Sequence, residues 1–403
     1  MKKMWHALII SLMIFFSTGS KATIVLAEGE RVKTQNDAVI SKQGGDLNFE
    51  DIYEEQFKSS GANKLKKNLP EEVQKDLDSI GVEDVDWKDL SEINPQKIYN
   101  FIINKFKNKL PTIIKSILTL LSMVIICSIF LSVKLSTDKK KIERILNFVC
   151  LLSICVVIIR PIVSIIVKTA SMMTILSKFI VSYIPIMAGV MYATGQSLLG
   201  SSYSTIMVIF SEFIMQMSSK VLIPTLNIFL ALSVASSMPA ECSFSGICTF
   251  FSKAVKWIIG VSTTLFVGIL TIQSVITSAA DGVGTKAIKF ILSGSVPVVG
   301  KALGDALLIV NGSIKLLKSG IGAFFLLAIG VIFIPIILDC LTWKMVTGIT
   351  LNISEAFGIN SASKVIKNTA EVLSLLLIVV LCCMVVLIVS TSLIILINPI
   401  NIA

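Results

Sequence analysis

The sequence predicts an all-α, polytopic integral membrane protein with a small exported helical region at its N-terminus. Hydrophobic residues make up 54% of the 403 residues and charged residues only 15%, whereas soluble domains are ~25% charged. Apolar runs long enough to cross a bilayer recur from residue 111 onward. This composition argues against an ordinary cytosolic enzyme.

Residues 1–27 are typical of a secretory signal peptide. Lys2 and Lys3 precede an apolar run from Ala7 to Phe16, and small residues follow. An uncleaved membrane anchor is the alternative. Both interpretations place the chain that follows outside the cytoplasm.

Residues 28–110 form an acidic region that is expected to be exported and helical. It carries 13 Lys/Arg and 17 Asp/Glu, a net charge of −4. Pro70-Glu71-Glu72 and Asn94-Pro95 are typical helix starts, and Gly81 is a helix stop. With about 80 residues and low hydrophobicity, the region is expected to be marginally stable alone. Docking to a partner and a plain solvated spacer are both open roles.

Residues 111–403 are expected to form a multi-span transmembrane domain of about 7–9 segments, since many apolar runs approach the length that crosses a bilayer. Phe179–Tyr192 and Phe290–Val310 are the weaker candidates. The stronger candidates are Ile113–Val133, Ile145–Val167, Thr205–Met217, Val221–Ser236, Trp257–Ala279, Ser319–Leu338 and Leu373–Leu396.

The loop over residues 134–144 is predicted to be cytoplasmic. It holds five Lys/Arg in eleven residues, and basic loops stay on the cytoplasmic side. This orientation agrees with an exported region before the first span. The number of spans and the side of the C-terminus are left open.

Two segments, 178–200 and 289–311, indicate an internal repeat. Both open with Lys-Phe-Ile-x-Ser and continue to a proline and a glycine. Proline and glycine in apolar segments are expected to break the helix, and paired broken segments point to a transport pathway. Chance similarity is the alternative. The expected break residues are Pro185, Gly189, Pro297 and Gly300.

Charges inside apolar runs are candidate pathway residues, because each costs ~2.5–3.5 kcal/mol at a helix centre on insertion scales. Glu212 lies in the middle of the run Ile209–Ile214. A pathway or ion-pair role and an interfacial position are equally open for it. Arg160 interrupts another run, where snorkelling to the interface is the simpler interpretation.

The densest charged cluster spans residues 281–305. It lacks the third glycine and the preceding strand of a phosphate-binding loop. Lys301 and Asp305 are spaced i,i+4, a weak pair if exposed and a neutralised site if in the membrane. The pathway or ion-pair candidates of the cluster are Asp281, Lys286, Lys289, Lys301 and Asp305.

Histidine and cysteine usage argues against an enzyme. The one histidine, His6, lies in the predicted signal, which excludes Ser-His-Asp catalysis and His-containing zinc sites in the mature chain. The eight cysteines lack metal spacing and are expected in apolar core or against lipid. No cofactor, metal or nucleic acid is expected.

Several motifs resemble the stage III sporulation protein AE family of endospore-forming bacteria. The likeness covers nearly the whole chain and is least in the exported region. It is strongest at Thr277-Ser-Ala-Ala-Asp281-Gly282, Lys286-Ala-Ile-Lys289-Phe290, Pro297-Val-Val-Gly300-Lys301, Gly304-Asp305-Ala306 and Lys315-Leu-Leu-Lys318-Ser-Gly320.

The resemblance implies a place in the mother cell membrane around the forespore. The family's proteins are thought to act with other stage III sporulation proteins of the same operon and with stage II sporulation protein Q. Together these form a channel or feeding tube needed for forespore development. The family has no motif with proven chemistry, so the resemblance implies no active site.

Three functions are compatible with these observations. The first is a non-enzymatic channel- or permease-like subunit of that complex, working as an oligomer or hetero-complex. The second is a self-sufficient, ion-coupled secondary transporter that uses Glu212, or Asp281 and Asp305. The third is a structural scaffold of the complex.

Overall fold

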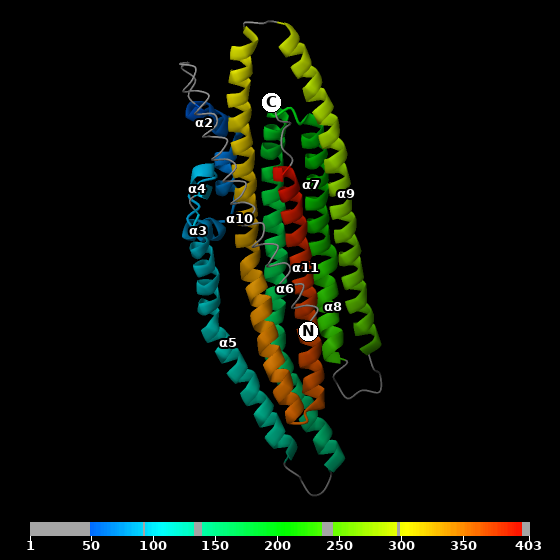
Figure 1. The fold of residues 1–403 in the computed structure, drawn as a ribbon. Helices are drawn as coiled ribbons and strands as arrows, with labels where there is room; N and C mark the ends of the chain where they lie inside the picture. Colours follow the sequence, from blue (N-terminus) through cyan, green and yellow to red (C-terminus); the bar gives the residue numbers. More distant parts are fainter. Residues whose placement is uncertain (1–48, 92, 133–138, 236–244, 296–298, 397–403) are drawn as a thin grey trace.

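The protein, described here from a computed structural model, is a bundle of long helices with a small helical region at one side (Figure 1). The structure describes residues 49–91, 93–132, 139–235, 245–295 and 299–396. Within these residues it contains helices and no strand. The elements are α2 Phe49–Ser60, η1 Ala62–Lys64, η2 Lys66–Asn68, α3 Glu71–Ser79, α4 Trp87–Ser91, α5 Pro95–Ser132, α6 Lys139–Ala193, α7 Ser197–Gln216, η3 Met217–Leu222 (a π-helix), α8 Ile223–Ala235, α9 Ser245–Ser295, α10 Val299–Ala356 and α11 Asn360–Leu396.

The helix signals of the N-terminal region are confirmed. Helix α3 begins directly after Pro70, and Gly81 follows its end with φ 92, a left-handed conformation that glycine adopts without a steric cost. Helix α5 begins at Pro95, and the Asn94 side-chain oxygen accepts a hydrogen bond from the Gln96 N–H at 2.8 Å. The expected domain boundary at residue 111 lies inside α5, because Pro111 is accommodated within that helix.

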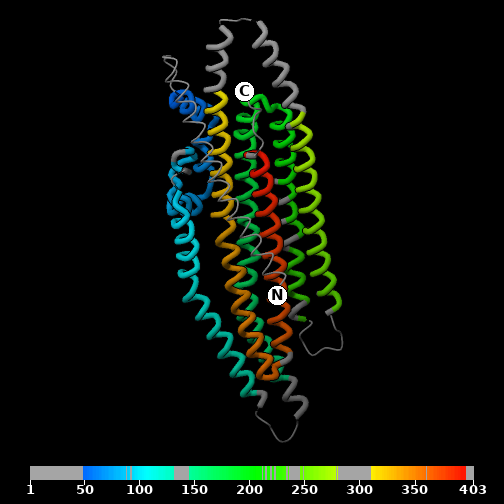
Figure 2. The backbone as a smooth tube through the Cα atoms, viewed as in Figure 1, coloured from blue at the N-terminus to red at the C-terminus, as the bar shows by residue number. Residues whose placement is uncertain are grey.

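The region before α5 packs on the first half of α10, more than 200 residues later in the sequence (Figures 1 and 2). Its core residues, such as Leu65, Leu77 and Val82, are fully buried. Gln56 accepts a hydrogen bond from the Ser313 hydroxyl at 2.7 Å. This region is therefore part of the bundle, and the open alternative of a plain solvated spacer does not describe residues 49–91.

The apolar runs fold into fewer and longer helices than the sequence predicts. The strong run Ile145–Val167 and the weak run Phe179–Tyr192 both lie in α6, which continues through them. Helices α7 and α8 are joined by the π-helix η3 without a turn between them. Within the described residues, separate apolar runs can therefore share one helix, because polar residues between two apolar runs do not by themselves end a helix.

Among the residues that the structure describes, five helices are long and apolar enough to cross a membrane, which confirms an all-α polytopic membrane protein. Their apolar parts are much longer than the ~20 residues that a bilayer requires. They are Pro95–Phe130, Ile145–Ala193, Thr249–Thr277, Val310–Ala356 and Ser361–Ile395.

The expected helix breaks in the first repeat segment are wrong. Pro185 and Gly189 both lie inside α6. A proline removes one backbone hydrogen bond, but a long helix packed against neighbours retains its path through that single loss. Gly300 is the second residue of α10, and Pro297 lies outside the described residues. The internal repeat itself stays a prediction.

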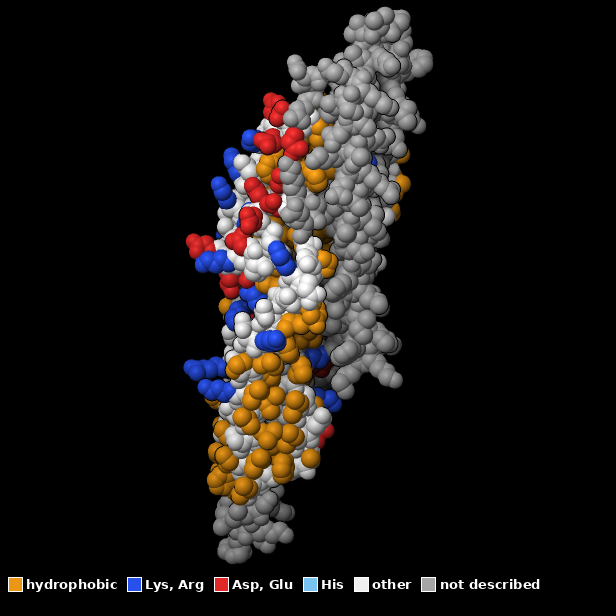
Figure 3. Space-filling view, turned by 60° about the vertical axis from the view of Figure 1, so that its left-hand side comes forward, with side chains coloured by type: hydrophobic (Ala, Val, Ile, Leu, Met, Phe, Trp, Pro, Cys, Tyr) orange, Lys and Arg blue, Asp and Glu red, His pale blue; other side chains and the backbone are white. Residues whose placement is uncertain are grey.

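The lower part of α5 presents a continuous hydrophobic surface, while charged side chains cover the part of the molecule above it (Figure 3). Lys109 and Lys115 are the last charged residues of α5. The helix rises ~35 Å from Lys109 to its end and ~26 Å from Lys115, values on either side of the ~30 Å thickness of a hydrocarbon core. Exposed apolar side chains on this stretch are Ile114, Leu118, Ile126, Ile129 and Phe130.

Candidate functional site

A lysine is buried in the interior of the bundle, where α10 meets the turn between α6 and α7. Lys318 is only 2% exposed, and its ammonium donates a hydrogen bond to Gln196 Oε1 at 3.0 Å. The turn residue Gly195 has φ 75, which lets the chain reverse and bring Gln196 back over α10. Lysine is almost never fully buried without partners, so this position is the strongest candidate for a functional charge among the described residues.

Polar groups continue from Lys318 along the same seam of α6, α7 and α10. The Thr194 hydroxyl donates to Gln196 Oε1 at 3.4 Å. Farther along, the phenol groups of Tyr183 on α6 and Tyr203 on α7 are buried next to each other, and Ser390 and Thr391 of α11 lie beside Tyr203.

Stacked aromatic rings close the interior next to these polar groups. The ring of Phe325 stacks on Tyr183 at 3.9 Å and on Phe179 at 5.2 Å between centroids. All three side chains are at most 1% exposed. Within this part of the chain, the seam is a packed core and not an open channel.

An ion-paired carboxylate joins three helices at the level where α5 becomes apolar. Asp339 of α10 forms an ion pair with Lys109 of α5, and Lys168 of α6 lies 3.9 Å from its second oxygen. Lys109 also donates to the Pro335 carbonyl at 3.1 Å. The charge of Asp339 is therefore neutralised within a candidate span, as membrane segments require.

The two isolated charges singled out in the sequence are both at the surface. Glu212 is exposed on α7 and accepts a hydrogen bond from Gln216 Nε2 at 2.7 Å. Arg160 is exposed on α6, which fits the snorkelling interpretation. The structure brings neither of them into the seam around Lys318.

The predicted charged cluster lies in the C-terminal part of α9 and at the start of α10. Asp281, Lys286 and Lys289 belong to α9, and Lys301 and Asp305 to α10. Their side chains lie outside the described residues. Their predicted pathway role therefore stays a prediction.

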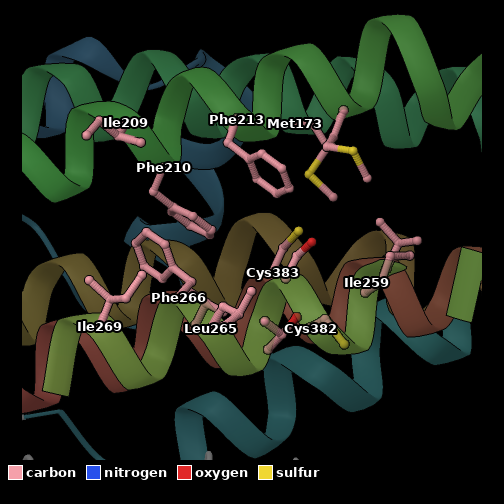
Figure 4. A pocket seen from close by; sticks show the side chains of 15 residues that line it. Met173, Ile209, Phe210, Phe213, Ile259, Leu265, Phe266, Ile269, Cys382 and Cys383 are labelled. Atoms are coloured by element: carbon pink, nitrogen blue, oxygen red, sulfur yellow. The ribbon is translucent and has the colours of Figure 1, made fainter. Parts of the chain in front are cut away.

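An apolar cavity of ≈ 290 Å³ opens between α6, α7, α9 and α11 (Figure 4). Phe210 and Phe266 both line it and pack against each other, with ring centroids 4.2 Å apart. Cys382 and Cys383 are among its lining residues, in agreement with the apolar role expected for the cysteines. The lining carries no charged side chain, so the cavity suits an apolar group such as hydrocarbon.

Sequence reasoning missed Lys318 and Asp339. Asp339 directly follows the candidate span Ser319–Leu338, and α10 continues through it to Ala356. Lys318 stands in the polar-looking stretch Lys315–Gly320, where burial does not show in the sequence. The one available signal was the order Lys315-Leu-Leu-Lys318, which places the two lysines one helical turn apart on the same face of a helix.

Comparison with known proteins identifies the family. A family model described as stage III sporulation protein AE matches residues 84–398. The curated stage III sporulation protein AE of Bacillus subtilis (strain 168) is 20% identical over 147 residues, which cover 36% of this chain and 37% of that protein. No solved structure matches the chain. Because the family model matches well over half of the residues, the chain belongs to the stage III sporulation protein AE family.

Proposed function

We propose that this sporulation membrane protein is a channel- or permease-like subunit of a complex between the mother cell and the forespore. It lies in the mother cell membrane around the forespore, with residues 28–110 on the extracytoplasmic side. Its partners are other stage III sporulation proteins and stage II sporulation protein Q, and the complex sustains forespore development. Family membership and the five apolar helices support the setting.

The buried lysine is the observation that carries the permease-like part of the proposal. Burying a charge away from water is costly, so a buried lysine marks a functional site more often than it adds stability. Lys318, Gln196 and Thr194 offer a cation, an amide and a hydroxyl along one seam. Such a set can bind and release an anionic or polar group.

The aromatic stack gives specific support to a second function, that of a structural scaffold. Phe179, Tyr183 and Phe325 fill the seam that a pathway through one chain would use. A permease-like subunit would then conduct along a surface shared with other subunits, while a scaffold would not conduct at all. The self-sufficient transporter has less support, because Glu212 is exposed and paired with Gln216 on the same helix.

Replacement of Lys318 tests the proposal. K318M keeps a long unbranched side chain in the core but removes the charge, and K315M is the matched control one turn away. We expect a gene deletion to block sporulation after engulfment and to leave vegetative growth intact. K318M should lower the yield of heat-resistant spores toward the deletion level, while K315M should sporulate normally.

The same experiment separates the alternatives, provided that immunoblots show equal amounts of each variant in the membrane. Normal sporulation of K318M would leave the scaffold as the function. A deletion strain that sporulates at the wild-type frequency would contradict any essential role in the complex.

A further inference from the structure

A polar cleft lies between α3 and α5, outside the apolar bundle. Its volume is ≈ 330 Å³. One wall is formed by Asp76 and Ser79 of α3. The floor is the first part of α5, which becomes the apolar stretch of the helix immediately beyond the cleft. The cleft therefore reaches from residues 49–91 down to the level where α5 becomes apolar.

Three asparagines form a ladder on the floor of this cleft. Asn100, Asn104 and Asn108 are spaced by four residues, so they lie one above the other on one face of α5. All three are exposed, and the part of the chain that the structure describes supplies no hydrogen-bond partner to their amides. Asparagine is a poor residue for a helix interior, so three on one face weaken a helix that Lys or Glu would strengthen.

The ladder matches the repeat of an extended polypeptide. Successive rungs are ~6 Å apart along the helix axis, because each residue rises ~1.5 Å. Alternate residues of an extended chain are ~6.6 Å apart. Each asparagine amide offers one acceptor and two donors, the complement of a peptide N–H and C=O. We infer that this cleft binds an extended segment of a partner protein through the partner's main chain.

The charges around the ladder favour an acidic segment. Lys105 is paired with Asp76 at 2.7 Å, which fixes the wall of the cleft and neutralises both groups. Lys97 lies over the backbone at Gly81, where a Cβ atom would come within 2.9 Å of its Nζ. Its ammonium adds a net positive charge at one end of the ladder. That the segment belongs to another sporulation protein rests on the proposed function, whereas the chemistry of the cleft does not.

Peptide binding to the purified full chain tests this inference. The probe is a fluorescent acidic octapeptide, (Ser-Glu)4, added to the protein in lipid nanodiscs, with binding followed by fluorescence anisotropy. Two variants of the probe control it: (Ser-Lys)4, and (Ser-Glu)4 with every second amide N-methylated. We expect the acidic peptide to bind best, and we expect N-methylation to abolish binding because it removes the backbone donors.

Asparagine variants locate the binding on the ladder. Removing one amide removes up to two hydrogen bonds to the peptide main chain, so N104A should weaken binding about tenfold. The control is N68A, which removes an exposed amide from η2. Alanine strengthens the α5 helix, so a loss of binding by N104A cannot come from unfolding.

Three results would overturn the inference: no binding of any probe at millimolar concentration, equal binding of the N-methylated peptide, or wild-type affinity for N104A. None of them depends on spore formation, so a failure here is distinguishable from a failure of the proposed function.

Discussion

Single polar side chains fix the packing of residues 49–91, and Tyr53 shows how. Its ring is 2% exposed and its hydroxyl donates to Asp86 Oδ1 at 2.9 Å. Burial of the phenol, with a contribution from Asp86, raises the pKa of Tyr53 well above its ordinary value. The hydroxyl is thus part of the core and must stay protonated there.

The Tyr53 hydroxyl predicts a loss of stability at high pH. A phenol whose pKa is raised by folding gives its full stabilisation below its unfolded pKa of ~10, and loses it as the pH rises beyond that value. Y53F should lower the free energy of unfolding by ~1–3 kcal/mol at pH 7, because the hydrogen bond that it removes is to a charged group. It should also remove the contribution of Tyr53 to the loss of stability above pH ~10.

The measurement is urea unfolding followed by the fluorescence of Trp87, which is buried beside Tyr53, in a chain whose other tryptophans are replaced by Phe. Equal pH dependence in Y53F and the parent would contradict the assignment.

The helix starts and stops set by single residues could be predicted from the sequence, but the burial of charged side chains could not. Helix caps such as Asn94 and Gly81 act on their own neighbours, so the sequence was sufficient to place them. Lys318 and Asp339 acquire their roles from helices more than 100 residues away, α6–α7 and α5. No local pattern distinguishes them from the exposed Glu212 and Arg160.

At the scale of elements, α5 and α10 run side by side in the same direction. Three contacts follow one another along α10: Ser313 with Gln56, Gly320 with Trp87, and Asp339 with Lys109. The first two attach the small helical region, and the third fixes α5 just above its apolar stretch. The two halves of the chain are therefore joined along one helix.

Removal of the Asp339 carboxylate should loosen this junction. D339A leaves Lys109 without its partner in a half-buried site, so we expect a loss of about 1–3 kcal/mol. K168M is the control, because Lys168 is 60% exposed and 3.9 Å away, and exposed pairs contribute less than ~1 kcal/mol. Unfolding of each purified variant in SDS measures its loss of stability. Equal losses in D339A and K168M would contradict a specific link between Lys109 and Asp339.

Gly320 provides the space in which α4 packs on α10. A Cβ atom there would lie 3.5 Å from Trp87 Cβ, an ordinary contact, so G320A should be tolerated. The larger side chain of G320L should displace α4 and expose residues 49–91 to trypsin. G260L is the matched control on α9, where nothing lies within 4 Å. Equal digestion of G320L and G260L would refute this packing.

Helix content was predictable, whereas helix ends inside apolar sequence were not. Pro161 and Pro185 both lie within α6. In isolation each favours a break, but neighbouring helices hold the chain straight, and the lost backbone bond is only one of many. The polar residues between α7 and α8 likewise suggested a break, but they lie in the π-helix η3, which joins the two helices.

At the scale of the whole molecule, the order of parts agrees with the sequence. An acidic helical region precedes a set of apolar helices, as the charge distribution indicated. The sequence placed a boundary between these two parts at residue 111 and predicted that the first would be marginally stable alone. The structure joins them through α5 and α10, since the apolar core of residues 49–91 is continuous with that of the bundle.

The central claim is that α5 carries the chain across the membrane, away from an extracytoplasmic helical region. Single cysteines at the exposed positions Asn63 and Glu355 test it most directly, in a chain whose native cysteines are replaced by Ser and which is expressed in vegetative cells. Asn63 belongs to the small helical region, whereas Glu355 lies ~24 Å along α10 beyond Asp339, toward the far end of the bundle (Figure 1). We predict that a membrane-impermeant maleimide labels N63C in intact cells and labels E355C only after the cells are permeabilised. Labelling of both residues in intact cells, or of E355C alone, would contradict the account.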